Sequence, residues 1–222
     1  TLTPSRLVRD CLNRIDEVEQ RIRAWISVDR EGALATASSL EKLGNPAQNP
    51  LWGIPIGIKD IIDVAGWPTS CGADWESPPS AATTDAQIVQ KLRAAGAIIL
   101  GKTVTTMWAC FDPPPTRNPW NLERTPGGSS SGSAAAVASG MCVAAIGTQT
   151  GGSILRPASF CGIAGLKPLH RPEMLAGVSL VSPTLDHVGP LASSADDLRL
   201  IWQGLGMNDV GDGDRSSEES LH

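Results

Sequence analysis

Residues 83–103 read TTDAQIVQKLRAAGAIILGKT, and this stretch decides the fold class. Its first part predicts a helix that is capped by Thr84 or Asp85 and ends at Gly96. The four residues AIIL (97–100) are aliphatic and β-prone, so they predict a short buried strand. A helix that leads through a glycine into a buried strand indicates an α/β protein.

The end of the same stretch imitates a nucleotide-binding motif. Residues 96–103, GAIILGKT, match the pattern G-x-x-x-x-G-K-T of a phosphate-binding loop. Such a loop needs flexible residues after a strand, with backbone N–H groups pointing inward at the start of a helix. Here the four residues are aliphatic and follow a helix. We therefore interpret Lys102 as a solvated lysine after a strand and not as a phosphate ligand.

Hydrophobic spacing and capping residues predict the remaining elements. Helices are expected at 3–25, 31–43, 132–140 and 194–206, and strands at 53–60 (GIPIGIKD) and 143–148 (VAAIGT). Residues 111–131 carry five prolines and predict a long ordered loop, and residues 148–157 predict a glycine-serine turn. Residues 1–206 are expected to form one domain, followed by an acidic, disordered tail over 207–222.

Composition excludes several classes of function. The chain has 222 residues, of which 41% are hydrophobic and 18% charged, and its net charge of −5 gives no electrostatic case for nucleic-acid binding. It shows no apolar run long enough for a membrane span and no signal peptide. Five cysteines without a C-x-x-C pair indicate reduced thiols and a cytoplasmic location, and three scattered histidines are too few for a metal cluster.

Two glycine-serine clusters could carry chemistry. They are GGSSSGS (127–133) and TGGS (150–153), and runs of glycine can present consecutive backbone N–H groups as an oxyanion hole. The first contains G-S-S-S-G, which matches a nucleophile elbow with Ser130 at its centre. However, a proline-rich loop precedes it instead of a strand. Asp186 and His187 are adjacent, so they point apart and fit poorly as a triad pair. A serine–histidine esterase is therefore the weaker interpretation.

Lys59 is the stronger candidate for a general base. It lies near the end of the predicted strand GIPIGIKD, where burial would lower its pKa below the usual value of about 10.4. Only a neutral lysine can accept a proton from a serine. Two other interpretations stay open from the residues alone, namely a surface lysine and a partner for Asp60.

The chain resembles the amidase signature family. The resemblance covers nearly everything from residue 1 to about 206, and its motifs occur in the family's order. They are PLWGIPIGIKDIIDVAGWPTSCG (50–72), TTDAQIVQKLRAAGAIILGKT (83–103), RNPWNLERTPGGSSSGSAAAVASG (117–140), GTQTGGSILRPASFCGIAGLKP (147–168) and SPTLDHVGPLASSADDL (182–198). It implies the N-terminal portion of that family's fold, a mixed central β-sheet flanked by α-helices.

The resemblance also implies a catalytic triad and a reaction. Carried over motif by motif, Lys59 is the base, Ser129 is the bridging serine and Ser153 is the nucleophile of an amide hydrolase. The peptide bond between Gly128 and Ser129 is expected to be cis. Ser153 would form an acyl-enzyme from a carboxamide or ureide, and Lys59 would move protons through Ser129.

The family's oxyanion hole is the turn before the nucleophile. The resemblance assigns it to the backbone N–H groups of Thr150, Gly151, Gly152 and Ser153 itself. No metal or organic cofactor is required for this chemistry.

Substrate binding is assigned to residues beside the two serine clusters. These are Arg156, Gly128 and Ser130. Arg156 three residues after the nucleophile, with Gln149 where many relatives carry Asp, resembles the branch that includes malonamidase and biuret-type amidohydrolases. The Arg156 guanidinium could bind a substrate carboxylate, which suggests a small, acid-bearing amide. Alternatively, Arg156 braces the turn. The tRNA-dependent glutamyl amidotransferase, through its A-type chain, is a less favoured identity, because its usual turn has the arginine one position earlier.

The chain is shorter than members of the family, which places two hypotheses side by side. In the first, it is an active amidase that homodimerisation completes, with a small-molecule amide as substrate and neither nucleic acid nor membrane as partner. In the second, it is an inactive C-terminally truncated fragment or a non-catalytic subunit that keeps the triad residues.

Overall fold

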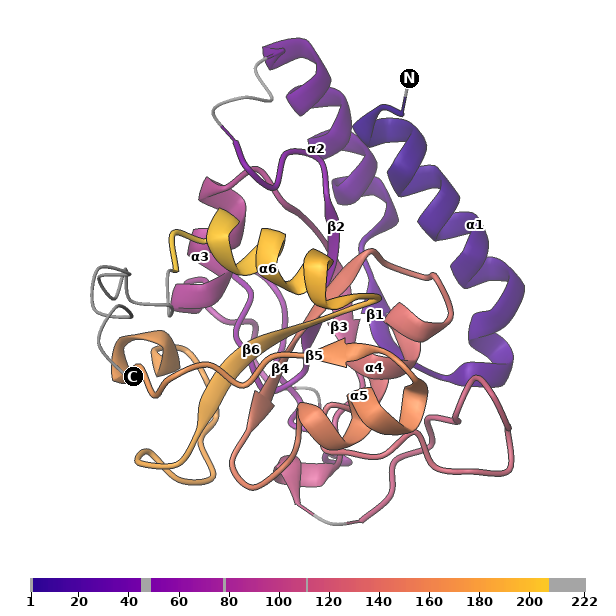
Figure 1. Ribbon diagram of the computed structural model, residues 1–222, viewed down its shortest axis with the longest axis vertical. Coiled ribbons are helices and arrows are strands. Elements are labelled where there is room, and N and C mark those ends of the chain that lie inside the picture. The colour runs from indigo at the N-terminus through magenta and orange to yellow at the C-terminus, as the bar shows by residue number, and fades with distance from the viewer. Residues whose placement is uncertain (1, 45–48, 78, 111, 208–222) are drawn as a thin grey trace, which may run out of the picture.

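The computed structural model describes residues 2–44, 49–77, 79–110 and 112–207, and Figure 1 shows its architecture. Six strands form one sheet in the order β1-β3-β2-β4-β6-β5. They are β1 Trp25–Val28, β2 Pro55–Lys59, β3 Ile98–Thr103, β4 Ala144–Gln149, β5 Ala164–Gly165 and β6 His187–Ala192. Strand β2 pairs in parallel with β3 and β4, whereas β1, β5 and β6 pair antiparallel with their neighbours. The mixed sheet confirms the predicted α/β class.

Helices cover both faces of the sheet. They are α1 Pro4–Ile22, α2 Arg30–Leu43, α3 Gln87–Ala94, α4 Ser131–Ala138, α5 Leu155–Cys161 and α6 Ala195–Gly204, with the 3-10 helices η2 Met107–Ala109 and η3 Pro172–Leu175. Side chains of α1, α2 and α4 form one core against the sheet, and those of α3 and α6 form another on its opposite face. Figure 1 shows α1 and α2 on the side away from α3 and α6.

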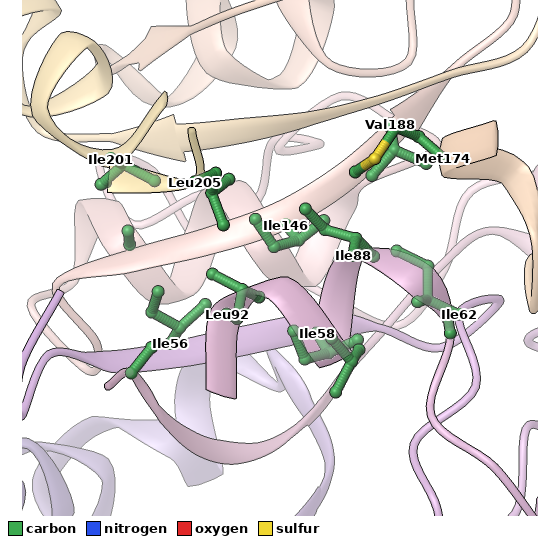
Figure 2. Close-up of a cluster of buried hydrophobic side chains, with 14 of the residues drawn as sticks. Ile56, Ile58, Ile62, Ile88, Leu92, Ile146, Met174, Val188, Ile201 and Leu205 are labelled. Atoms are coloured by element: carbon green, nitrogen blue, oxygen red, sulfur yellow. The ribbon is translucent and has the colours of Figure 1, made fainter. Parts of the chain in front are cut away.

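The core under α3 and α6 holds β2 in place. Ile56 and Ile58 of β2 lie beside Ile146 of β4, and α3 packs Ile88 and Leu92 against them (Figure 2). All five are completely or almost completely buried, and burying each such side chain stabilises the fold by about 1.5–3 kcal/mol. Alternate isoleucines therefore anchor β2, and the strand ends at Lys59 in a fixed position.

A glycine permits the close approach of α4 to the sheet. A Cβ atom at Gly132 would lie 2.2 Å from the carbonyl oxygen of Ala24 and 2.4 Å from the backbone nitrogen of Val104. The backbone N–H of Gly132 instead donates to the carbonyl of Val104 at 2.9 Å. Any larger residue would push the helix outward, and with it the serine segment that leads into α4.

Several predicted elements are confirmed. Helix α2 ends at Gly44 in a left-handed cap, and the Ser194 side chain caps α6 by accepting from the backbone N–H of Asp197. Strand β3 continues through Lys102 to Thr103, so the G-K-T residues belong to a strand and form no phosphate loop.

Two predicted helix boundaries are wrong. The first helix ends at Ile22, because Trp25 begins the edge strand β1, which pairs with β3. The third begins at Gln87, and no side chain caps it. Asp85 does not cap α3, because its carboxylate accepts from the backbone N–H of Ala65 at 2.8 Å and binds Arg93.

Three elements, α5, β5 and β6, have no counterpart among the predicted ones. Strand β6 contains Gly189 and Pro190, which disfavour a central strand, yet its register with β4 runs without a break from Ala144↔Ala192 to Gln149↔His187. Four of the five cysteines are buried, and Cys110 is exposed. Within the described residues, no helix is long and apolar enough to cross a membrane. Of the predicted disordered tail, 208–222 lie outside the described residues.

Candidate active site

Lys59 ends β2 and lies at the centre of a buried polar cluster. Its side chain is 0% exposed, and Nζ donates to the hydroxyl of Ser129 at 2.6 Å and to the hydroxyl of Thr148 at 2.8 Å. These contacts join β2, the segment before α4, and β4. A lysine fixed between two hydroxyls is positioned to exchange protons with either of them.

Burial lowers the pKa of Lys59 to about 7, and the negative charge of Asp186 opposes this shift. Desolvation dominates because an ammonium ion loses its hydration in the interior. The adjacent carboxylate, Asp60, does not serve Lys59, because it lies 2.8 Å from Lys102 Nζ. Lys59 can therefore lose its proton near neutral pH, which is what a general base requires.

Ser129 is held by its backbone. The Gly128–Ser129 peptide bond is cis, as the resemblance implied. The carbonyl of Ser129 accepts from the backbone N–H of Thr106 at 3.2 Å, and Ser131 Oγ donates to the carbonyl of Gly127 at 2.7 Å. Ser129 is 1% exposed, so its hydroxyl meets protein groups and not bulk water.

Ser153 lies at the end of the glycine turn and just before α5. Its carbonyl accepts from the backbone N–H of Ser130 at 3.2 Å, which ties the two serine segments together. The hydroxyl of Ser153 makes no hydrogen bond within the described residues. A Cβ atom added at Gly151 or Gly152 would meet no atom within 4 Å, so the turn borders open space. A substrate carbonyl could approach the turn there.

Polar side chains hold this turn from both sides. Gln149 Oε1 accepts from the backbone N–H groups of Ile154 at 2.9 Å and Leu155 at 3.0 Å, at the start of α5. On the other side, Thr150 Oγ1 donates to Asp186 Oδ1. Neither Thr148 nor Asp186 was predicted to hold the site in this way. Thr148 lies two residues before Thr150 on an alternating strand, and that spacing was the only available signal.

The esterase interpretation of Ser130 is wrong. Ser130 is 0% exposed, and its Oγ donates to the Thr148 carbonyl at 3.2 Å, so its hydroxyl cannot act as an exposed nucleophile. Asp186 is buried against Thr150, whereas the His187 ring lies 3.1 Å from Lys167 Nζ and is half-exposed. The same burial argues against the expected substrate contact of the Ser130 side chain.

Arg156 braces the serine segment. Its Nε donates to the carbonyl of Gly128 at 2.9 Å, so the expected substrate-binding residues Arg156 and Gly128 contact each other. Its partner is a carbonyl and not the carboxylate that the bracing alternative named. Arg156 makes no ion pair within the described residues. The guanidinium is exposed, and its outer nitrogens are free to bind an anion.

Lys102 is not a solvated lysine, contrary to the sequence prediction. It is 1% exposed and forms a buried ion pair with Asp60 Oδ1 at 2.8 Å. It also donates to Thr69 Oγ1 at 3.0 Å and to the Pro68 carbonyl at 3.3 Å. The pair joins β3 to the loop after β2 and leaves Lys59 without a carboxylate partner of its own.

Known proteins share this fold and these motifs. The chain is 42% identical over 211 residues to the A-type chain of the glutamyl-tRNA(Gln) amidotransferase of Nitratidesulfovibrio vulgaris (strain DP4), covering 92% of this chain and 43% of that relative. The native peptide amidase from Stenotrophomonas maltophilia superposes with a TM-score of 0.80 at 36% identity, covering 89% of this chain and 43% of the other. The corresponding glutamyl-tRNA(Gln) amidotransferase chain from Thermotoga maritima gives 0.71 at 33% identity, covering 90% and 43%.

The chain therefore spans less than half the length of these relatives. The model of the family described as Amidase matches residues 6–221, nearly the whole chain. This protein belongs to the amidase family.

Proposed function

We propose that the chain carries the catalytic centre of an amidohydrolase that cleaves a carboxamide or ureide C–N bond. Lys59 is the base, Ser129 the relay and Ser153 the nucleophile. The observation that carries the proposal is the 2.6 Å contact between Lys59 Nζ and Ser129 Oγ, on a lysine whose pKa burial lowers to about 7. A lysine in this state can accept a proton at neutral pH.

The reaction begins with proton transfer along the three residues. Neutral Lys59 accepts the proton of Ser129, and Ser129 accepts that of Ser153, whose oxygen attacks the substrate carbonyl carbon. Ser129 and Ser153 must come within hydrogen-bond distance when substrate binds, since catalytic hydrogen bonds tighten in the substrate complex. The proton then returns through Ser129 to the leaving nitrogen, and the C–N bond breaks.

The glycine turn would stabilise the charge that develops on the carbonyl oxygen. The backbone N–H groups of Thr150, Gly151, Gly152 and Ser153 are the proposed donors, and the open space around the two glycines supports this role. One such donor contributes about 10²–10³-fold to the rate. Water subsequently hydrolyses the acyl-enzyme on Ser153, and Ser129 and Lys59 again accept the proton.

We further propose that Arg156 binds an acidic group on the substrate. Its guanidinium is exposed beside Gly128, adjacent to the bridging serine. The prediction separates two readouts in Arg156→Ala. A substrate role raises KM about 10-fold or more for amides that bear a carboxylate and leaves KM for neutral amides unchanged. A role limited to bracing Gly128 lowers kcat for both kinds of amide equally.

A second candidate is the ammonia-releasing component of an amidotransferase, which takes ammonia from an amide donor. The 42% identity to a chain of a glutamyl-tRNA(Gln) amidotransferase favours it. Both candidates use the same acyl-enzyme, so substrate choice separates them. Ammonia release from glutamine or glutaminyl groups, and not from small acid-bearing amides, would favour the amidotransferase.

The decisive experiment is covalent labelling. The chain is treated with a sulfonyl fluoride, and the modified residue is mapped by mass spectrometry. We expect an adduct at Ser153 that disappears in Lys59→Ala and persists in the exposed-lysine control Lys42→Met. An absent adduct, together with no ammonia release from simple amides, would instead support an inactive fragment. Gel filtration of the same sample tests the expected homodimer.

A further inference from the structure

Two threonine hydroxyls at the end of β4 hold groups of opposite charge. Thr148 Oγ1 accepts from Lys59 Nζ at 2.8 Å, and Thr150 Oγ1 donates to Asp186. The two threonines are two residues apart, so along an extended strand their side chains leave on the same side. The base and this carboxylate therefore approach the nucleophile turn from neighbouring positions on one face.

Asp186 is built into the site by its partners. It is 4% exposed and directly precedes β6, beyond the register pair Gln149↔His187, which places it across from Thr150. Its Oδ2 accepts from the backbone N–H groups of Val181 at 2.7 Å and Ser182 at 3.0 Å. Each carboxylate oxygen thus has a donor, and Thr150 provides the link to the turn.

We propose that Asp186 is a positioning residue with two tasks: it fixes the oxyanion turn through Thr150, and it supplies the negative charge that the Lys59 amine faces. The inference rests on the proposed function and deepens it, because it names the group that sets the pH range of the base. Without Asp186, the buried lysine would be neutral at all working pH values. It would then be a weaker base, since basicity falls with pKa.

The charges on the surrounding elements leave this role to Asp186. Asp60, which follows β2, and Lys102 of β3 pair with each other at 2.8 Å. Arg156 of α5 points its Nε at the Gly128 carbonyl. From β6, His187 contacts Lys167 at 3.1 Å on the outside of the sheet. The pKa of Lys59 agrees with this assignment, because the charge of Asp186 raises it against the larger lowering by burial.

The variant Asp186→Asn isolates the charge. An asparagine can keep all three contacts, with its oxygen accepting from the two N–H groups and its amide donating to Thr150 Oγ1. Losing a nearby negative charge destabilises the ammonium form, so we expect the pKa of Lys59 to fall by about one unit. The measurement is the titration of Lys59 by NMR on protein with 13C-labelled lysine, with the Lys59 signal identified by its loss in Lys59→Met.

The complementary variant Thr150→Val isolates the positioning. It removes the hydroxyl that binds Asp186 and keeps the charge, and Thr150→Ser is its rescue. We expect sulfonyl fluoride labelling of Ser153 to slow about 10- to 100-fold in Thr150→Val, with the Lys59 titration unmoved, and to recover in Thr150→Ser. In Asp186→Asn, the acid limb of the labelling rate should move to lower pH together with the NMR midpoint.

Each outcome decides the inference. An unmoved Lys59 midpoint in Asp186→Asn overturns the charge role, and an unchanged labelling rate in Thr150→Val overturns the positioning role. If Asp186→Asn does not fold, Thr150→Val and Thr150→Ser decide alone. Should the wild-type chain fail to hydrolyse any amide while Lys59 still shifts in Asp186→Asn, the proposed function fails and the electrostatic role of Asp186 stands.

Discussion

Lys102 Nζ lies 2.8 Å from Asp60 Oδ1 in the interior, and Asp60 directly follows the unpaired Lys59 along the chain. Two lysines on neighbouring strands are thus both buried, yet only one has a carboxylate partner. The pairing of Asp60 with Lys102 leaves Lys59 to two hydroxyls, neither of which stabilises an ammonium ion as a carboxylate does. The difference between a structural lysine and a candidate base lies in this allocation of one carboxylate.

The pair predicts a large loss of stability when one partner is removed. In Lys102→Met, Asp60 becomes a buried carboxylate without a counter-charge, and burial already raises its pKa. Breaking a buried pair in this way typically costs about 3–5 kcal/mol. Urea denaturation at pH 7 measures the effect.

Two controls test that explanation. The double variant Asp60→Asn/Lys102→Met removes both charges and should recover most of the lost stability, whereas Lys42→Met, at an exposed site, should change it by less than about 0.5 kcal/mol. If the double variant were as unstable as Lys102→Met alone, lost packing and not the orphaned charge would be the cause.

The reactivity of Ser153 should depend on pH through Lys59. Because the base must be neutral, the rate of sulfonyl fluoride labelling should rise with pH and level off above a midpoint near 7, the pKa of Lys59. Lys59→Arg keeps a positive charge that cannot be lost, so its rate should fall by about 10²–10⁴-fold at every pH. A midpoint that persists in Lys59→Arg would assign the titration to another group.

The sequence predicts the site better than its surroundings, because the signals for the site are local. Alternating isoleucines place Lys59 at the end of a strand, and glycine-serine clusters mark Ser129 and Ser153. The burial of Lys102 depends on β3 lying beside β2, a long-range pairing that no local pattern contains. Likewise, β6 carries Gly189 and Pro190 and becomes a strand because β4 and β5 pair with it.

The role of Asp186 could not be predicted for the same physical reason. Its neighbour His187 suggested a catalytic dyad, whereas the structure turns Asp186 inward to Thr150 and leaves His187 at the surface. Adjacent residues on an extended segment point apart, as expected from the sequence. Which of the two faces the site depends on the register between β4 and β6, and this register is set by the whole sheet.

Gln149 should stabilise the segment that carries the nucleophile. Gln149→Ala leaves the buried N–H of Ile154 and that of Leu155 without an acceptor, which costs about 1–3 kcal/mol. The same change should slow labelling of Ser153, because the start of α5 is no longer fixed. Gln149→Glu keeps an acceptor of the same length beside the positive end of a helix, so it should retain both stability and labelling. Equal losses in both variants would show that the side-chain amide group, and not the acceptor oxygen, is required.

Lys59 should make the fold less stable at neutral pH than in alkaline solution. Its pKa is about 7 in the folded chain against an ordinary value of 10.5, so between these values the unfolded state binds a proton that the folded state does not. The free energy of unfolding should therefore rise with pH by about 1.4 kcal/mol per unit in this window and show no such slope below it. Lys59→Met lacks the titrating group, so its stability advantage over the wild type should be largest at pH 7 and shrink towards pH 10. Urea denaturation of both proteins across that range measures the difference, and a constant difference would mean that Lys59 keeps its proton when buried.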